Sequence, residues 1–98
     1  MTTEQRVTQV VFQAIEVVNQ ARPSGQRVRL STDEPLLAAG SVLDSLGLVN
    51  FVVAVEDEIA EEFGVTINLA DERMRSQANS PLRNVQSLVG YLVGVVKV

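Results

Sequence analysis

The residues best suited to chemistry in this chain are Asp44 and Ser45, within the segment Leu43-Asp44-Ser45-Leu46-Gly47. A loop rich in small residues precedes the segment, and a long stretch with helical apolar periodicity follows it. A serine where a loop becomes a helix holds its hydroxyl in solvent, with unpaired backbone N–H groups nearby. Such a position suits a serine that another protein must reach and modify.

Asp44 and Ser45 also fit a purely structural role. Either side chain can accept a hydrogen bond from the first turn of the following helix, as N-cap residues do. Such caps are common, so the residue types alone favour this interpretation of Ser45. The two roles are compatible, because Asp44 can cap the helix while Ser45 remains accessible.

The composition offers few other catalytic groups. The 98 residues include no Cys and no His, which excludes disulfides, Cys-based zinc sites, thiol nucleophiles and His-dependent acid–base catalysis. A hydrolase built on Ser45 would lack a base, since the one lysine, Lys97, stands at the far end of the chain. Carboxylate pairs such as Asp57–Glu61 lack a second kind of ligand. We expect neither a metal site nor an enzyme.

The net charge of −4 is unevenly distributed. No Lys or Arg occurs between residues 44 and 72, where the acidic residues are Asp44, Glu56, Asp57, Glu58, Glu61, Glu62, Asp71 and Glu72. Such a segment repels phosphate backbones, so we expect no nucleic-acid binding. Runs of acids usually form a solvated helix face, but they can also steer a basic partner towards the chain.

The size of the chain and its apolar runs indicate one soluble domain over residues 1–98. The longest apolar runs, Phe51–Val55 and Tyr91–Val96, are far shorter than the roughly 20 residues that span a bilayer. The polar start, Met1–Arg6, lacks the apolar run of a signal peptide. We expect a cytoplasmic monomer that does not insert into membranes.

Apolar periodicity predicts an all-α fold with four helices, over residues 3–20, 45–63, 69–76 and 84–96. Thr2 or Thr3 and Asn84 are suitable N-caps, and Gly64 is a suitable C-terminal stop. Residues 22–43 form a long connection, in which Arg27–Leu30 alternates like a strand but lacks a partner, so we interpret it as extended loop. These elements predict a four-helix bundle with a long first loop and a short third helix.

The second predicted helix has two apolar faces. The residues at core spacing are Leu48, Phe51, Val52, Val55, Ile59 and Phe63. Leu46, Val49 and Val53 lie on a neighbouring face, and their types fit either a wider core or a small exposed patch. Exposed apolar groups beside charges are typical of transient interfaces.

The order of these parts resembles the acyl carrier protein family, also called the phosphopantetheine-attachment domain. The resemblance covers roughly residues 5–96, nearly the whole chain. It rests on Asp44-Ser45-Leu46, Val49, Glu56-Asp57-Glu58, Ile59, Phe63, Val65, Ile67, Asn84-Val85, Leu88 and Tyr91-Leu92. The tripeptide alone is a weak signal, and its placement in a chain of this length, charge and helix order strengthens it.

Within that family, Leu43-Asp44-Ser45-Leu46-Gly47-Leu48-Val49 is similar to the Leu-Asp-Ser-Met-Gly-x-Val pattern of D-alanyl and other free-standing carriers. Fatty-acid carriers have Gly two positions before the Asp and acids soon after the Leu. This chain has Val42 at the first place and Gly47 and Asn50 at the others. The resemblance therefore indicates a dedicated carrier in a specialised biosynthetic pathway.

The resemblance implies that Ser45 carries 4′-phosphopantetheine derived from coenzyme A, whose thiol holds an acyl or aminoacyl group as a thioester. It implies that Asp44 helps the phosphopantetheinyl transferase hold its metal. The other implied partners are a loading ligase and a downstream transferase or synthase. The implied docking residues are Leu46, Val49, Val53, Glu56 and Asp57. The alternative is a helical interaction module that is never modified and binds a basic partner through its acidic second helix.

Overall fold

The computed structural model describes residues 2–36, 43–69 and 81–96, with the backbone alone at Ser24 and Ser45. These residues form the helices α1 (Thr3–Asn19), α2 (Ser45–Phe63) and α4 (Val85–Val96), and the 3₁₀ helix η1 (Ser24–Gln26). No β-strand occurs in the described ranges, so the all-helical prediction is confirmed there. The four-helix bundle is not confirmed, because the predicted third helix, 69–76, lies outside the described residues apart from Leu69.

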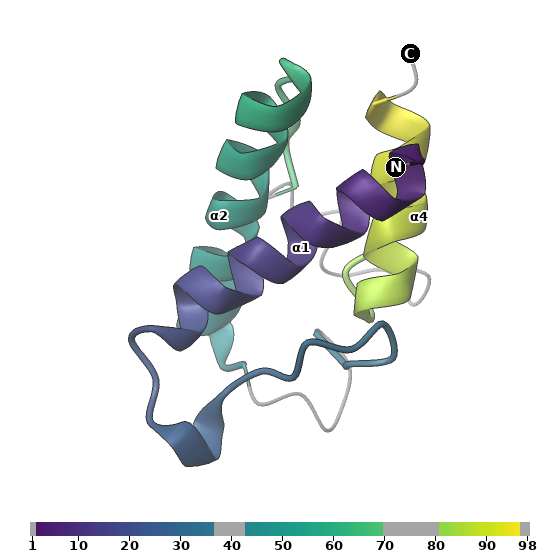
Figure 1. Ribbon diagram of the computed structural model, residues 1–98. Helices are drawn as coiled ribbons and strands as arrows, with labels where there is room; N and C mark the ends of the chain where they lie inside the picture. Colours follow the sequence, from purple (N-terminus) through teal and green to yellow (C-terminus); the bar gives the residue numbers. More distant parts are fainter. Residues whose placement is uncertain (1, 37–42, 70–80, 97–98) are drawn as a thin grey trace.

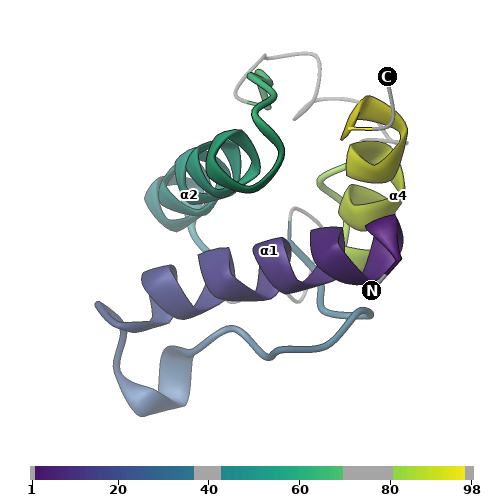
Figure 2. The ribbon, with the colours of Figure 1, turned by 45° about the horizontal axis from the view of Figure 1, so that its top comes forward.

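Helix α1 lies diagonally across α2 and α4 and packs against both (Figure 1). Its first turns lie beside α4, and its last turn lies near the start of α2, as the second view also shows (Figure 2). This crossing places residues that are more than twenty positions apart in sequence around the beginning of α2.

The helix ends carry the predicted caps. At the start of α1, the Thr2 hydroxyl accepts the backbone N–H of Gln5 at 3.1 Å, and the Gln5 side chain accepts the N–H of Thr2 at 2.9 Å. At the start of α4, the Asn84 side chain accepts the N–H of Ser87 at 2.8 Å. Gly64 ends α2 in the left-handed region, with φ of 68°.

The extended loop after η1 is tied to the helices by hydrogen bonds. The Asn19 amide donates to the Val28 carbonyl at 2.9 Å and accepts the Val28 N–H at 2.8 Å. The carbonyls of Thr32 and Glu34 accept the first N–H groups of α4, those of Gln86 at 2.8 Å and Val85 at 3.1 Å. The loop therefore satisfies donors that the first turn of α4 leaves without helical partners.

Glu34, which belongs to this loop, is buried, and its carboxylate lies 2.8 Å from the guanidinium of Arg29. The hydrogen bond to Glu34 raises the pKa of the Arg29 guanidinium above its ordinary value. This pairing offsets the cost of taking the Glu34 charge out of water.

Apart from Phe51, the buried apolar core of the described residues is aliphatic. Every apolar residue at core spacing in α1 is buried, namely Val7, Val10, Val11, Ala14, Ile15 and Val18. Helix α2 buries its predicted stripe against them, with Leu48, Phe51, Val52, Val55 and Ile59 inside. Phe63 is half-buried, and the Arg6 guanidinium lies 4.6 Å from the centre of its ring.

Candidate functional site

Asp44 is the N-cap of α2, and Ser45 is the first residue of the helix. The Asp44 carboxylate accepts the backbone N–H of Gly47 at 2.7 Å, and its carbonyl accepts the N–H of Leu48 at 2.9 Å. The predicted cap is therefore confirmed for Asp44, which is itself exposed. Ser45 follows the cap directly, as the first residue of the first turn of α2.

Gly47 permits a close approach of three groups that a side chain would disturb. A Cβ atom built on Gly47 would lie 3.0 Å from Asp44 Oδ1, 3.1 Å from Arg22 Nη1 and 3.2 Å from Leu43 Cδ2. Arg22 Nη1 and Asp44 Oδ1 therefore approach the same point beside the start of α2. A hydrogen bond from Arg22 Nε to the Gln26 carbonyl, at 2.7 Å, holds the Arg22 side chain in this position.

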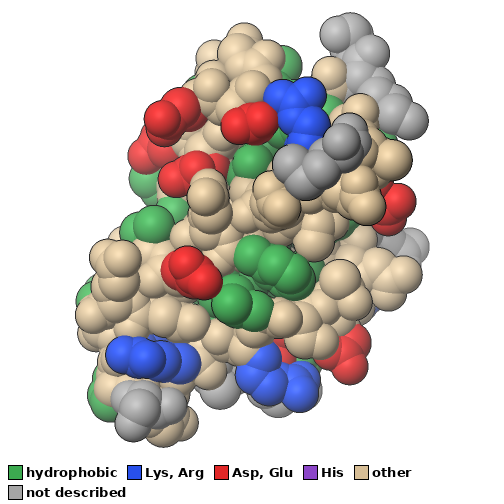
Figure 3. All heavy atoms as spheres, in the orientation of Figure 1, with side chains coloured by type: hydrophobic (Ala, Val, Ile, Leu, Met, Phe, Trp, Pro, Cys, Tyr) green, Lys and Arg blue, Asp and Glu red, His purple; other side chains and the backbone are tan. Residues whose placement is uncertain are grey.

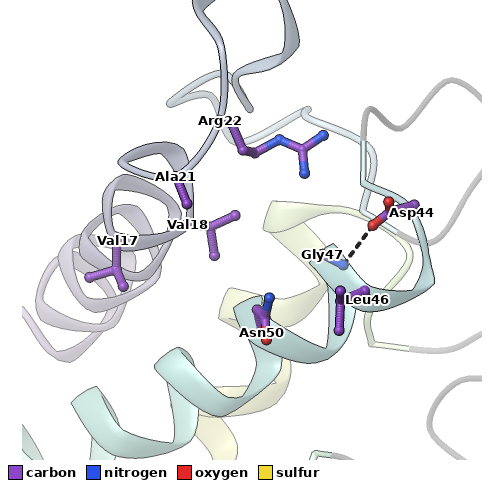
Figure 4. A pocket seen from close by; sticks show the side chains of 8 residues that line it. All are labelled: Val17, Val18, Ala21, Arg22, Asp44, Leu46, Gly47 and Asn50. Atoms are coloured by element: carbon purple, nitrogen blue, oxygen red, sulfur yellow. Dashed lines mark hydrogen bonds between the residues drawn. The ribbon is translucent and has the colours of Figure 1, made fainter.

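A cleft of about 350 Å³ lies between the end of α1 and the start of α2. The residues that line it are Val17, Val18, Ala21, Arg22, Asp44, Leu46, Gly47 and Asn50. Apolar groups from both helices form its walls, and Figure 4 shows the Arg22 side chain extending above it towards Asp44. Neither this cleft nor the place of Arg22 in it was predictable from apolar periodicity or residue spacing.

The three residues on the neighbouring face of α2 are exposed. Leu46 is 69% exposed, Val53 46% and Val49 40%, so these side chains belong to the surface and not to a wider core. Val17 of α1, at 49%, adds a fourth exposed apolar group, which shares the cleft with Leu46. Apart from Leu30, the exposed large apolar residues of the described ranges therefore lie on this face of α2 or, for Val17, in the cleft beside its start.

The acids of α2 divide into two groups. Glu56 is half-buried and accepts the backbone N–H of Leu69 at 2.6 Å, and Glu62 pairs with Arg6 of α1 at 2.8 Å. Both carboxylates make contacts with other segments of the fold, and docking through Glu56 stays a prediction. Asp57 and Glu61 are exposed. Figure 3 shows acidic side chains gathered over the C-terminal half of α2.

Within residues 2–36, 43–69 and 81–96, no cluster of three or more acidic side chains is placed to hold a metal ion. None of the helices in these ranges combines the length and apolar character needed to cross a bilayer. No protein family, curated protein or solved structure matches this chain.

Replacing Gly47 by Ala tests the close approach at the start of α2. Replacing glycine by alanine within a helix normally raises the free energy of unfolding by about 0.5–1 kcal/mol. We expect that gain for Gly90→Ala in α4, where nothing lies within 4 Å of the added carbon. Gly47→Ala should not show this gain in stability, because Asp44 Oδ1 and Arg22 Nη1 must move to make room for the added methyl group. Urea unfolding of both variants measures the difference, and equal stabilisation would show that the three groups make no demand on Gly47.

Proposed function

We propose that this protein is a carrier for an acyl or aminoacyl group, bearing 4′-phosphopantetheine on Ser45. The observation that supports the proposal most strongly is the position of Ser45 as the first residue of α2, between the exposed residues Asp44 and Leu46. A modifying enzyme can approach this segment, since the helix begins at the surface. The absence of Cys from the sequence is compatible with a thiol supplied by the arm.

In the proposed transfer, the Ser45 hydroxyl oxygen attacks the β-phosphate of coenzyme A. A new P–O bond to Ser45 forms, and the bond from that phosphorus to the bridging oxygen breaks. Adenosine 3′,5′-bisphosphate leaves, and a base on the transferase takes the hydroxyl proton. The transferase supplies the magnesium ion that neutralises the charge developing on the phosphates. The carrier contributes the nucleophile and the surface that presents it.

The exposed apolar residues next to Ser45 suit short-lived contacts with several enzymes. Leu46, Val49 and Val53 supply the apolar part of such a surface, and Asp57 supplies charge at its border. An acidic border raises the association rate with basic partner surfaces more than it raises affinity. We propose that a loading ligase and a downstream transferase or synthase use this surface in turn. The same surface also supports the alternative, an unmodified interaction module.

Modification by a purified enzyme separates the two functions. The protein is incubated with coenzyme A, magnesium and a broad-specificity phosphopantetheinyl transferase, and its intact mass is recorded. We expect the mass to rise by one phosphopantetheine group. An unchanged mass, in conditions where an established carrier is fully modified, would contradict the carrier proposal and leave the interaction module.

Two substitutions of Asp44 separate its capping role from its proposed role in transfer. Asp44→Asn keeps an N-cap of equal quality but removes the charge, so the free energy of unfolding should stay within about 0.5 kcal/mol. Asp44→Ala removes the cap and should cost about 1 kcal/mol. We expect both variants to be modified more slowly and to need more magnesium. Transfer to Asp44→Asn at the unmodified protein's rate would show that Asp44 only caps the helix.

A further inference from the structure

The cleft between α1 and α2 lies beside the residue that the proposed function modifies. Asp44 and Leu46, which flank Ser45 in the chain, both line it. Of the exposed large apolar residues, Val17 lines it from α1 and Leu46 lines it from α2 (Figure 4). An enzyme that covers Ser45 therefore has this cleft directly within its contact area.

The chemistry of the cleft indicates the kind of group that fills it. Its walls are mostly apolar, from Val17, Val18, Ala21 and Leu46, with Asn50 as a polar group on the α2 side, and its volume of about 350 Å³ admits one large side chain. Arg22 and Asp44 lie together at its edge and carry opposite charges. A charge-balanced edge around mostly apolar walls favours an uncharged and largely apolar occupant. Pockets of this kind seat the anchoring side chains of protein–protein interfaces.

Among the proposed partners, the transferase is the one that must contact the residues around Ser45 and this cleft. Enzymes that act on the cargo reach it at the end of a long arm and need not cover the attachment point. The transferase acts on the Ser45 hydroxyl itself, so its surface must close over the start of α2. The exposed acid Asp57 lies further along the same helix, where its charge can steer a basic transferase surface towards the carrier.

We propose that the phosphopantetheinyl transferase inserts an apolar side chain into this cleft, so that α1 as well as α2 is recognised. This inference rests on the proposed function, because it assigns a binding determinant to the same reaction. The anchor contributes to binding before the phosphoryl group is transferred. Loss of the anchor should therefore raise the KM for the carrier and leave kcat nearly unchanged.

The test measures transfer kinetics with the carrier as the varied substrate. Val17→Gln makes one wall polar, and Ala21→Leu fills the cleft from the end of α1. We expect either change to raise the KM about tenfold, which corresponds to the loss of one interface anchor. Leu30→Gln is the matched control, because Leu30 is 48% exposed against 49% for Val17 but does not line the cleft. Its KM should stay within about twofold of the unmodified protein's.

Each result has one meaning. A normal KM for both Val17→Gln and Ala21→Leu, in proteins that are fully modified, overturns the cleft contact and leaves the carrier function intact. An equal rise in KM for Leu30→Gln also overturns it, since the effect would not be specific to the cleft. If the unchanged protein takes up no phosphopantetheine, the proposed function and this inference fail together. Thermal unfolding of each variant verifies that the fold is retained.

Discussion

A Ser45→Ala variant is expected to take up no phosphopantetheine, whereas the unchanged protein is fully modified. The substitution removes the side-chain hydroxyl of residue 45, which is the nucleophile in the proposed transfer. Stability should hardly change, because Asp44 supplies the cap of α2 and alanine is a good helix former. Intact mass measures the modification, and circular dichroism during heating measures the stability.

Ser31→Ala is the control for this prediction. Ser31 lies in the extended loop, and its hydroxyl contacts Asp33 and not the start of α2. We expect this variant to be modified as fully as the unchanged protein. A mass gain that persists in Ser45→Ala, or that disappears in Ser31→Ala, would place the attachment elsewhere.

Phe51→Ala should lower the free energy of unfolding by about 3–5 kcal/mol. Phe51 is 1% exposed and is among the largest fully buried side chains of the described core. Removing its ring leaves a cavity in a small aliphatic core, which can collapse only in part. The loss is large against the roughly 5–15 kcal/mol that holds typical proteins folded. Urea unfolding at equilibrium gives the value.

Val53→Ala is the matched control on the same helix. Val53 is 46% exposed and lies two residues beyond Phe51. Its free energy of unfolding should stay within about 0.5 kcal/mol of the unchanged protein's. Comparable losses for Phe51→Ala and Val53→Ala would contradict the assignment of the two faces of α2.

Helix boundaries were predictable where short-range signals define them. Helix α2 runs over Ser45–Phe63 as predicted, because Asp44 caps its start and Gly64 ends it in the left-handed region. Helix α1 ends at Asn19 and not at residue 20, and Asn19 there uses its amide to bind Val28. The start of α4 moves from Asn84 to Val85, since Asn84 serves as the cap.

Apolar periodicity and residue spacing could not predict the contacts between segments that are distant in sequence. Arg22 reaches the start of α2 because α1 crosses it, and no local pattern encodes that crossing. The ion pair between Arg6 and Glu62 depends on the same packing. The hydrogen bond that the Leu69 N–H donates to Glu56 joins α2 to a residue thirteen positions further along the chain. The Asp44 cap was therefore predictable from the sequence, the role of Ser45 stays a prediction, and the separate contacts of Glu56 and Glu62 were not predictable.

The most direct test of the account is a site-resolved mass spectrum of the protein isolated from the cells that make it. Fragments spanning Leu43–Gly47 would show which side chain carries any added group. The account predicts one phosphopantetheine group, free or acylated, on Ser45. A protein that is unmodified in those cells, or that carries the group on another residue, would contradict it.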